Sequence, residues 1–270
     1  MSKSKSLILK ILTVVFLVVF FLIEPTVSEN IRARKSVKHS KESVFRLKFT
    51  NGVYTGTGFM INTVGNMLTC AHVVDSSSGR YGKCVDSLIA ENYVTLQLDS
   101  NIIFNDVISY RVSVDTIIPE LDLAILTVDL TVPIYKKLSG LNLAIGRPVY
   151  MGFANSDSLW EGQEVFTCAY IKDDFTIPKP VIAKGVISTI RENCYDPNMK
   201  NKVDIIQLDL NISKGNSGAP IFLPSNGRVI GLLDWGIFGD SKWQTGYAVA
   251  LTTNQIVDKL RELKIPVDFR

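Results

Sequence analysis

The sequence predicts an all-β fold, either a sandwich or a barrel. Short runs rich in β-branched and aromatic residues recur between residues 44 and 251, and turn signals such as Asn51-Gly52 and Gly65-Asn66 separate them. Many short strands at this spacing are typical of sandwiches and barrels. A chain of 270 residues is long enough for one large domain or two small ones.

The expected strands fall into two series. The first series comprises Val44–Phe49, Thr55–Ile61, Tyr93–Leu98, Tyr110–Ile117 and Leu123–Val128. The second series comprises Pro148–Phe153, Val165–Tyr170, Val181–Ser188, Val203–Leu210, Ala219–Leu223, Val229–Leu233 and Tyr247–Leu251. The turn-rich residues 131–146 would join two halves of about equal size.

One helix is expected near the end of the chain, over Asn254–Leu263. Ile256, Leu260 and Leu263 would line one face of this helix, and Pro266 would stop it.

The first 28 residues are typical of an export signal. Lys3, Lys5 and Lys10 precede an uncharged apolar run over residues 11–23, which is short for a membrane span and suits a signal-peptide core. Cleavage after Ser28 would release the protein as a secreted or periplasmic form. The alternative is an uncleaved membrane anchor over residues 7–23, with Lys10 reaching the interface.

Charge is distributed unevenly along the chain. Residues 1–28 carry a net charge of +2 and residues 29–41 a net charge of +4, so the +3 of the whole chain leaves −3 for residues 42–270. We expect residues 29–41 to be a basic, disordered lead-in. The mildly acidic remainder lacks the basic face of a nucleic-acid-binding protein, so no nucleic-acid partner is expected.

The chain has four cysteines, which an exported protein could pair as disulfides in three ways. Sequence favours neighbour pairing only weakly, Cys70 with Cys84 and Cys168 with Cys194. Buried free thiols are the alternative for Cys70 and Cys168, because both lie in apolar, strand-like runs. With two histidines and no Cys-x-x-Cys pair, the chain lacks the pattern of a zinc site.

Two segments carry residues suited to nucleophilic catalysis. His72 follows a strand-like run in Thr69–Val74, and the other histidine of the chain lies in the basic segment before residue 42. Ser217 stands in Lys214–Pro220, where glycines bracket a serine at a tight turn. Such a turn can direct the N–H groups of Gly215 and Ser217 into one concavity that stabilises an oxyanion. Each segment alone could equally be a structural histidine or an ordinary surface turn.

Asp122 opens the apolar run Leu123–Val128. A carboxylate at the start of a buried strand needs a partner, and an imidazole N–H is a suitable one. The alternatives are a strand-edge aspartate that faces water, or Asp129 as the functional carboxylate.

Together these segments resemble the motifs of the chymotrypsin-like, or trypsin-fold, serine peptidases, and within that family the high-temperature-requirement (Deg-type) branch. The matching motifs are GTGF at Gly56–Phe59, TCAHVV at Thr69–Val74, LDLAIL at Leu121–Leu126 and GNSGAP at Gly215–Pro220. The order His, Asp, Ser separates the chain from α/β-hydrolases, whose order is Ser, Asp, His. The resemblance covers residues 42–265.

The resemblance implies two six-stranded antiparallel β-barrels, a C-terminal helix, and His72, Asp122 and Ser217 in the cleft between the barrels. It implies a serine endopeptidase that acts on protein or peptide substrates through an acyl-enzyme, with Gly215 and Ser217 as the oxyanion hole and no metal or organic cofactor. A non-catalytic binding module with the same fold is the alternative. We expect no C-terminal peptide-binding domain of the kind found in the Deg-type branch, and the oligomeric state stays open.

Family placement also gives an expected substrate pocket, lined by Asn211, Ile212, Asp234, Trp235, Gly236 and Gly246. Asn211 stands where trypsin-type members carry an acid that attracts Arg and Lys, so its neutral amide argues against a strong basic preference, although Asp234 leaves this open. Asn216 stands where those members carry the aspartate that binds a new N-terminus. The resemblance therefore implies activity without proteolytic activation.

Overall fold

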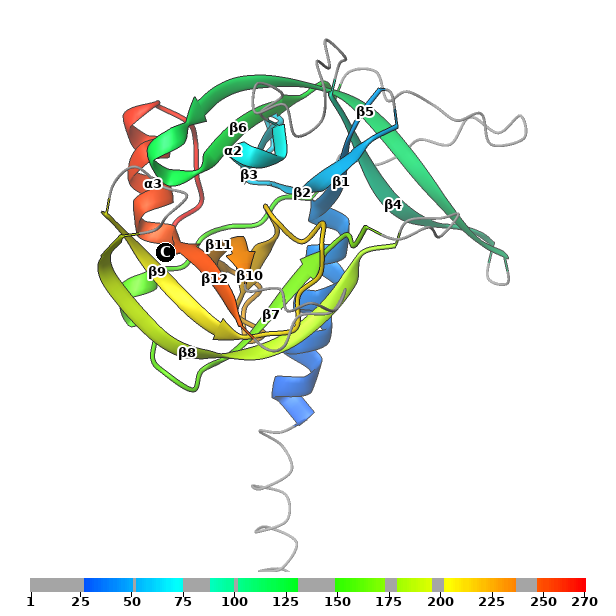
Figure 1. Ribbon diagram of the computed structural model, residues 1–270. Coiled ribbons are helices and arrows are strands. Elements are labelled where there is room, and N and C mark those ends of the chain that lie inside the picture. Colours follow the sequence, from blue (N-terminus) through cyan, green and yellow to red (C-terminus); the bar gives the residue numbers. More distant parts are fainter. Residues whose placement is uncertain are drawn as a thin grey trace, which may run out of the picture.

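The computed structural model describes residues 27–50, 52–74, 88–99, 102–130, 149–172, 179–195, 202–236 and 247–270. These residues form two closed barrels of six antiparallel strands each. Figure 1 shows the barrel of strands β1 to β6 above the barrel of strands β7 to β12, with helix α3 at their side. The predicted all-β fold with two six-stranded barrels is confirmed.

The first barrel has the strand order β1-β2-β3-β6-β5-β4 and closes because β1 pairs with both β2 and β4. Two of its strands, β1 and β6, have the predicted bounds, whereas β4 and β5 extend well beyond them. The strands are β1 Val44–Phe49, β2 Tyr54–Met60, β3 Asn66–Cys70, β4 Leu88–Asp99, β5 Ile102–Ile118 and β6 Leu123–Val128.

The second barrel has the strand order β10-β11-β12-β9-β8-β7 and closes through the pairing of β10 with β7. Its strands are β7 Glu164–Ala169, β8 Val181–Tyr195, β9 Lys202–Asp209, β10 Pro220–Phe222, β11 Val229–Gly236 and β12 Ala248–Thr252.

The predicted strand Pro148–Phe153 is wrong. Its described part, residues 149–153, holds a single isolated bridge at Phe153, which pairs with Phe269 and Val229. The Phe153 N–H donates to the Asp268 carbonyl at 2.7 Å, and the Arg270 N–H donates to the Phe153 carbonyl at 3.1 Å. The apolar run is therefore buried against the C-terminal tail instead of entering a barrel.

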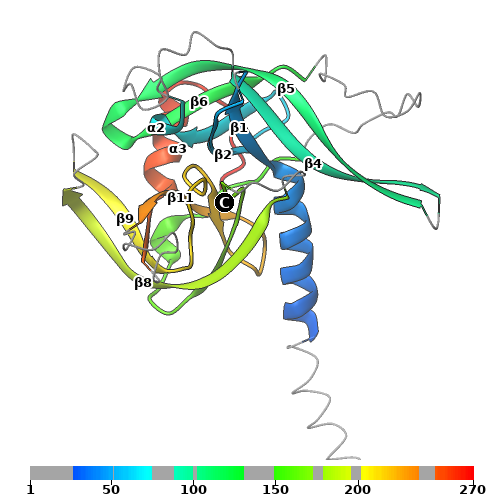
Figure 2. The ribbon, with the colours of Figure 1, turned by 45° about the vertical axis from the view of Figure 1, so that its right-hand side comes forward.

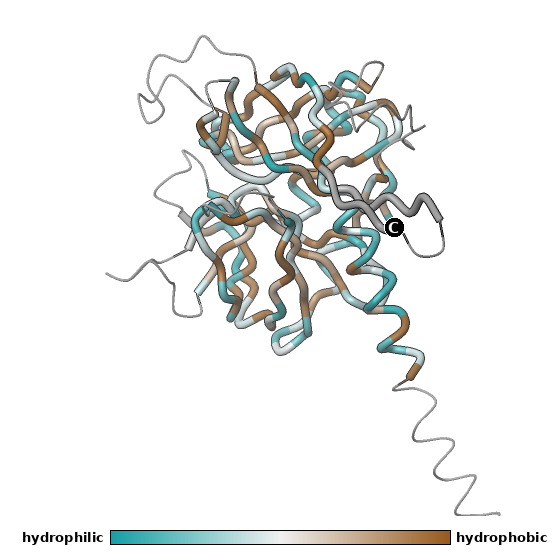
Figure 3. The backbone as a smooth tube through the Cα atoms, turned by 90° about the vertical axis from the view of Figure 1, so that its right-hand side faces the viewer, coloured by the Kyte–Doolittle hydropathy of each residue, from teal (hydrophilic) through white to brown (hydrophobic). Residues whose placement is uncertain are grey.

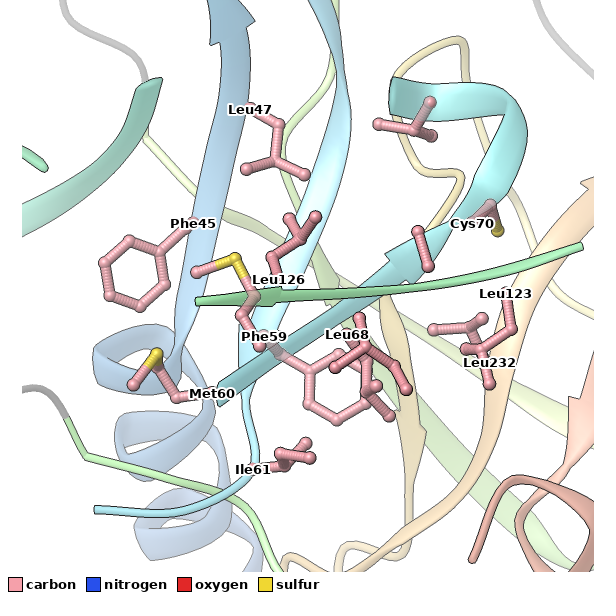
Figure 4. Close-up of a cluster of buried hydrophobic side chains, with 14 of the residues drawn as sticks. Phe45, Leu47, Phe59, Met60, Ile61, Leu68, Cys70, Leu123, Leu126 and Leu232 are labelled. Carbon is pink, nitrogen blue, oxygen red and sulfur yellow. The ribbon is translucent and has the colours of Figure 1, made fainter. Parts of the chain in front are cut away.

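The apolar core of the first barrel continues into the second barrel. Figure 4 shows Leu232 of β11 beside Leu123 of β6 and Leu68 of β3, and all three are buried. Every residue of β2 is buried, and both Tyr54 and Thr57 of this strand hydrogen-bond the Gly215 carbonyl in the loop before β10. This packing fixes the two barrels against each other, and the candidate site lies where they meet.

Helix α3 spans Thr253–Glu262, close to the predicted helix. Ile256, Val257 and Leu260 are buried against the barrels. Leu263, which was expected on the same face, is 43% exposed because the helix ends one residue before it.

A helix over residues 27–43 replaces the disordered lead-in expected for residues 29–41. Ser36, Ser40 and Ser43 lie on one face at helical spacing and are buried against the rest of the protein. The Ser36 hydroxyl donates to the Pro224 carbonyl at 3.0 Å, and His39 Nε2 hydrogen-bonds the Tyr150 carbonyl at 2.8 Å. Small polar residues at this spacing thus dock a helix that lacks an apolar face.

Figure 2 shows this N-terminal helix running past the second barrel and projecting beyond it, and Figure 3 shows hydrophilic residues along most of its length. In the described part of the chain, no helix is long and apolar enough to cross a membrane. The expected signal or anchor over residues 1–26 and the junction over residues 131–146 lie outside the described residues.

The expected disulfide pairing is wrong for the described cysteines, because Cys70, Cys168 and Cys194 are free thiols. Strand register keeps Cys168 opposite Ile182, whereas Cys194 lies far along the same strand β8. Burial raises the pKa of the Cys168 thiol to about 12. Cys84 lies outside the described residues.

Candidate active site

The pairing of β3 with β6 brings the expected histidine and aspartate together. Cys70 at the end of β3 lies opposite Leu123 at the start of β6, so the residues just beyond these strand ends are neighbours. His72 lies in the short helix α2, Ala71–Val74, which follows β3 directly. Asp122 lies between a 3₁₀ turn at Pro119–Leu121 and β6.

Asp122 contacts the first turn of α2 through both its backbone and its side chain. Its carbonyl accepts from the Ala71 N–H at 2.7 Å, and its Oδ1 accepts from the His72 backbone N–H at 2.9 Å. Its Oδ2 hydrogen-bonds Nδ1 of the His72 ring. A proton on Nδ1 leaves Nε2 as the basic nitrogen of the imidazole.

The electrostatic environment keeps Asp122 ionised. Burial opposes ionisation, but the hydrogen bonds and the charge of His72 outweigh it and lower the pKa of Asp122 below its ordinary value. An ionised Asp122 both orients the imidazole and would stabilise an imidazolium.

Ser217 lies in the loop that precedes β10, and hydrogen bonds join this loop to both barrels. The Gly218 N–H donates to the Leu233 carbonyl at 2.8 Å, and the Ser217 carbonyl accepts from the Thr57 N–H at 2.9 Å. A Cβ at Gly56 would lie 2.7 Å from a methyl of Val73 and 3.0 Å from the Ser217 carbonyl oxygen. The absence of a side chain at Gly56 therefore lets the serine loop approach α2.

The peptide between Lys214 and Gly215 is held in one orientation. The Lys214 carbonyl accepts from the Lys172 N–H at 2.7 Å, and in a planar trans peptide the Gly215 N–H must point the opposite way. Gly215 has a φ of 101°, in the region that favours glycine.

The next carbonyl, that of Gly215, accepts from the Thr57 hydroxyl at 2.8 Å, and it shares the Tyr54 hydroxyl, at 2.9 Å, with the Tyr170 carbonyl, which is 2.7 Å from that hydroxyl. Among the described residues, neither the Gly215 N–H nor the Ser217 N–H has an acceptor. Two unpaired N–H groups two residues apart in a tight turn are the donors that an oxyanion hole requires.

Asp234, which was expected in the substrate pocket, lies beside the His72 imidazole. It is 3% exposed, and its Oδ1 is 3.8 Å from His72 Nδ1. The Cys70 thiol donates to the carbonyl of Leu233, the residue just before Asp234, at 3.3 Å. Sequence reasoning missed this placement, although an acidic residue interrupting the apolar run of β11 was a signal of it.

The other expected pocket residues are described only in part. Asn211 is exposed and Ile212 is 5% exposed, both in the segment between β9 and the serine loop. Trp235 and Gly236 are the last two residues of strand β11. Gly246 lies outside the described residues.

The same cluster has residue types that bind metals. Within the described part of the chain, the ligand atoms of Cys70, His72, Asp122 and Asp234 lie within 4.8 Å of one another. A thiol must lose its proton to bind a metal, but burial raises the pKa of Cys70 well above its ordinary value. The cluster therefore suits proton transfer better than metal binding.

The fold and this arrangement of side chains define the class of protein. The model of the trypsin-like peptidase domain family matches residues 56–232, and the chain belongs to this family. The resemblance to its Deg-type branch is confirmed by related proteins. The chain is 30% identical over 76% of its length to a probable periplasmic serine endoprotease DegP-like of Chlamydia pneumoniae. It is 28% identical over 66% of its length to the chloroplastic protease Do-like 5 of Arabidopsis thaliana.

These alignments cover 34% of the Chlamydia protein and 47% of the Arabidopsis protein, so the chain spans between a third and a half of these relatives. Solved structures show the same fold. The HtrA-type protease AlgW with a decapeptide superposes with a TM-score of 0.60 at 18% identity, over 86% of this chain and 67% of that one. Deg5 superposes with a TM-score of 0.59 at 19% identity, over 85% of this chain and 92% of that one.

Proposed function

We propose that this chain is a serine endopeptidase that hydrolyses peptide bonds of proteins. The observation that carries the proposal is the pair of hydrogen bonds from His72 to the Asp122 carboxylate, which leaves Nε2 as the base. The N–H groups of Gly215 and Ser217, which have no acceptor among the residues that the structure describes, support it, as does membership of the trypsin-like peptidase family.

In the proposed reaction, Ser217 Oγ forms a bond to the scissile carbonyl carbon while its proton passes to His72 Nε2. The negative charge moves to the carbonyl oxygen, where the N–H groups of Gly215 and Ser217 stabilise it, each by about 3 kcal/mol. The C–N bond then breaks, and the leaving amine takes the proton from His72. A water molecule repeats these steps on the acyl-enzyme, which releases the acid and restores the Ser217 hydroxyl.

The test is the substitution Ser217→Ala, which removes a half-buried hydroxyl at a turn and should leave the fold intact. We expect casein hydrolysis by the purified variant to fall about 10⁴-fold. A fluorophosphonate probe should label the wild type and not the variant. Absence of labelling in a folded wild type would support the alternative, a non-catalytic binding module.

We further propose that the primary pocket accepts uncharged side chains. Asn211 is neutral, and the buried carboxyl of Asp234 is turned toward Asp122 and His72, so it does not attract a substrate cation. Cleavage of a peptide library should therefore show no strong preference for Arg or Lys, and a dominant basic preference would contradict this.

We also propose that residues 1–28 direct export. Replacing residues 14–19 with polar residues should keep the protein in the compartment where it is made, because export machinery recognises the apolar core of a signal. N-terminal sequencing of the exported form should start at Glu29 if the signal is cleaved, and near residue 1 if it serves as an anchor.

A further inference from the structure

A second buried carboxyl group shares the space behind the imidazole. Asp234 Oδ1 is 3.8 Å from His72 Nδ1, and a carboxylate oxygen of Asp234 lies within 4.8 Å of one of Asp122. The described titratable groups that face Asp234 are Cys70 on β3, His72 on α2, and Asp122 ahead of β6. The site thus holds two carboxyl groups for one imidazole, one more than the proposed mechanism uses.

A β-bulge directs Asp234 into this position. In the pairing of β11 with β12, Leu233 lies opposite Ala250 and Trp235 opposite Val249, so Asp234 is the extra residue between two consecutive pairs. A bulge bends the strand and re-aims the side chain of the extra residue. Because the Leu233 carbonyl accepts from both Gly218 and Cys70, the bulge is anchored next to the serine loop and the end of β3.

Two carboxyl groups this close and this buried do not both ionise, since each charge disfavours the other. Asp122 is the better site for the negative charge, because it accepts hydrogen bonds from the backbone and ring N–H groups of His72. Asp234 is 3% exposed and lies 3.8 Å from the ring nitrogen, a longer contact than those of Asp122. The shared proton therefore belongs on Asp234.

We propose that Asp234 is a positioning residue that keeps its proton at neutral pH, donates it to the Asp122 carboxylate and so fixes that carboxylate against His72. This inference rests on the proposed peptidase function and extends it. A neutral Asp234 leaves one negative charge beside the imidazole. An ionised Asp234 would add a second negative charge, which would favour the imidazolium and leave less of the neutral His72 imidazole that accepts the proton of Ser217.

Two substitutions distinguish a protonated Asp234 from an ionised one. Asp234→Asn keeps a donor and the size of a protonated carboxyl group, so we expect kcat and KM within about threefold of the wild type. Asp234→Leu keeps the volume without a donor, so we expect kcat to fall about 10- to 100-fold, the effect of losing a hydrogen bond to a charged group, with KM within about twofold. Wild-type kcat in Asp234→Leu would overturn the proposal.

The pH profile of kcat/KM gives the second readout. With a neutral Asp234, the midpoint of the acid limb in Asp234→Asn should stay within about 0.3 pH unit of the wild type. If Asp234 is ionised, removing its charge should lower that midpoint by about one unit or more, which would overturn the proposal. Asp258→Asn, which removes an exposed carboxylate from α3, is the matched control and should leave kcat and the midpoint unchanged.

A third readout does not need peptidase activity. In the Ser217→Ala protein, the ¹H resonance of His72 Nδ1–H should persist and titrate at the same pH with Asp234 or with Asp234→Asn. It should broaden or shift with Asp234→Leu, in a protein whose thermal unfolding shows that it is folded. A midpoint displaced by a unit in Asp234→Asn would overturn the role of Asp234. An inactive wild type with the expected resonances would overturn only the proposed function.

Discussion

Asp122 is held in place by its backbone conformation as well as by its carboxylate. Its φ of 45° lies in the left-handed region, which Asp and Asn adopt more readily than most residues. This conformation ends the 3₁₀ turn at Leu121 and turns the Asp122 carbonyl toward the Ala71 N–H. Both the left-handed backbone conformation and the hydrogen bonds of the carboxylate therefore favour aspartate at position 122.

Asp122→Asn should separate these two roles. The amide tolerates the left-handed conformation, so we expect the fold to persist, but it stabilises the wrong tautomer of His72. We expect kcat to fall about 10⁴-fold with KM nearly unchanged. Asp129→Asn, which changes the carboxylate directly after β6, is the control and should retain activity. The opposite result in this pair of variants would show that Asp129 is the functional carboxylate.

At the scale of elements, strand β2 connects the first barrel to the serine loop of the second. The Thr57 hydroxyl donates to the Gly215 carbonyl, the Tyr54 hydroxyl is shared between the Gly215 and Tyr170 carbonyls, and the Thr57 N–H donates to the Ser217 carbonyl. The guanidinium of Arg46 stacks over the Tyr54 ring, 4.8 Å from its centroid. The orientation of the oxyanion donors thus depends on a strand that contributes no proposed catalytic residue.

Thr57→Val should test this connection, because it removes one donor to the Gly215 carbonyl and keeps the shape of the side chain. We expect kcat to fall about five- to tenfold, the effect of losing the donor to the Gly215 carbonyl, with little change in KM. The substitution also removes the acceptor of the Tyr170 N–H, which lies 3.0 Å from the Thr57 hydroxyl. Thr55→Val is the matched control on the same strand, since the Thr55 hydroxyl donates to the Leu47 carbonyl instead. Equal losses of kcat in both variants would point to a general effect on β2.

At the scale of the whole molecule, the buried thiol of Cys168 should make the free energy of unfolding fall at alkaline pH. Burial raises the pKa of Cys168 to about 12, whereas a thiol in the unfolded chain ionises near pH ~8.5. The stabilisation is fully present below about pH 8.5 and is lost progressively as pH rises toward about 12, because only the unfolded state releases the proton there.

Urea unfolding at pH 7.5 and pH 9.5 measures this loss. We expect the free energy of unfolding to fall less between these two pH values in Cys168→Ala than in the wild type. Cys194→Ala, which changes a half-buried thiol, should behave like the wild type. An equal fall in all three proteins would exclude Cys168 as the cause.

Activity should not depend on a newly cut N-terminus. Asn216 is 4% exposed, and its side-chain oxygen accepts from the Ser213 N–H at 3.2 Å, so the serine loop is closed by its own hydrogen bonds. A buried ammonium would find no counter-charge on this amide. We expect residues 27–270 with an uncleavable fusion ahead of Val27 to hydrolyse casein as fast as the same protein after the fusion is removed. Activity that appears only on removal would contradict this.

The sequence by itself determined every strand of the two barrels except β3, the terminal helix, and the motifs around His72, Asp122 and Ser217. Alternating burial and turn residues are local signals, and they gave β1 and β6 their observed bounds. The strand predicted for residues 148–153 was wrong, because an apolar run indicates that a segment is buried but not which part of the protein packs against it.

Only the tertiary structure decided where Asp234 points, which carbonyls the loop at Gly215 uses, and that residues 27–43 form a docked helix. Asp234 was expected in the substrate pocket, but a bulge in β11 turns it toward His72, and a bulge depends on the register between two strands. The helix docks through Ser36, Ser40 and Ser43, whose burial needs the surface of the folded barrels. These features arise from contacts between residues far apart in the chain, and such contacts cannot be predicted from the local pattern of apolar and polar residues.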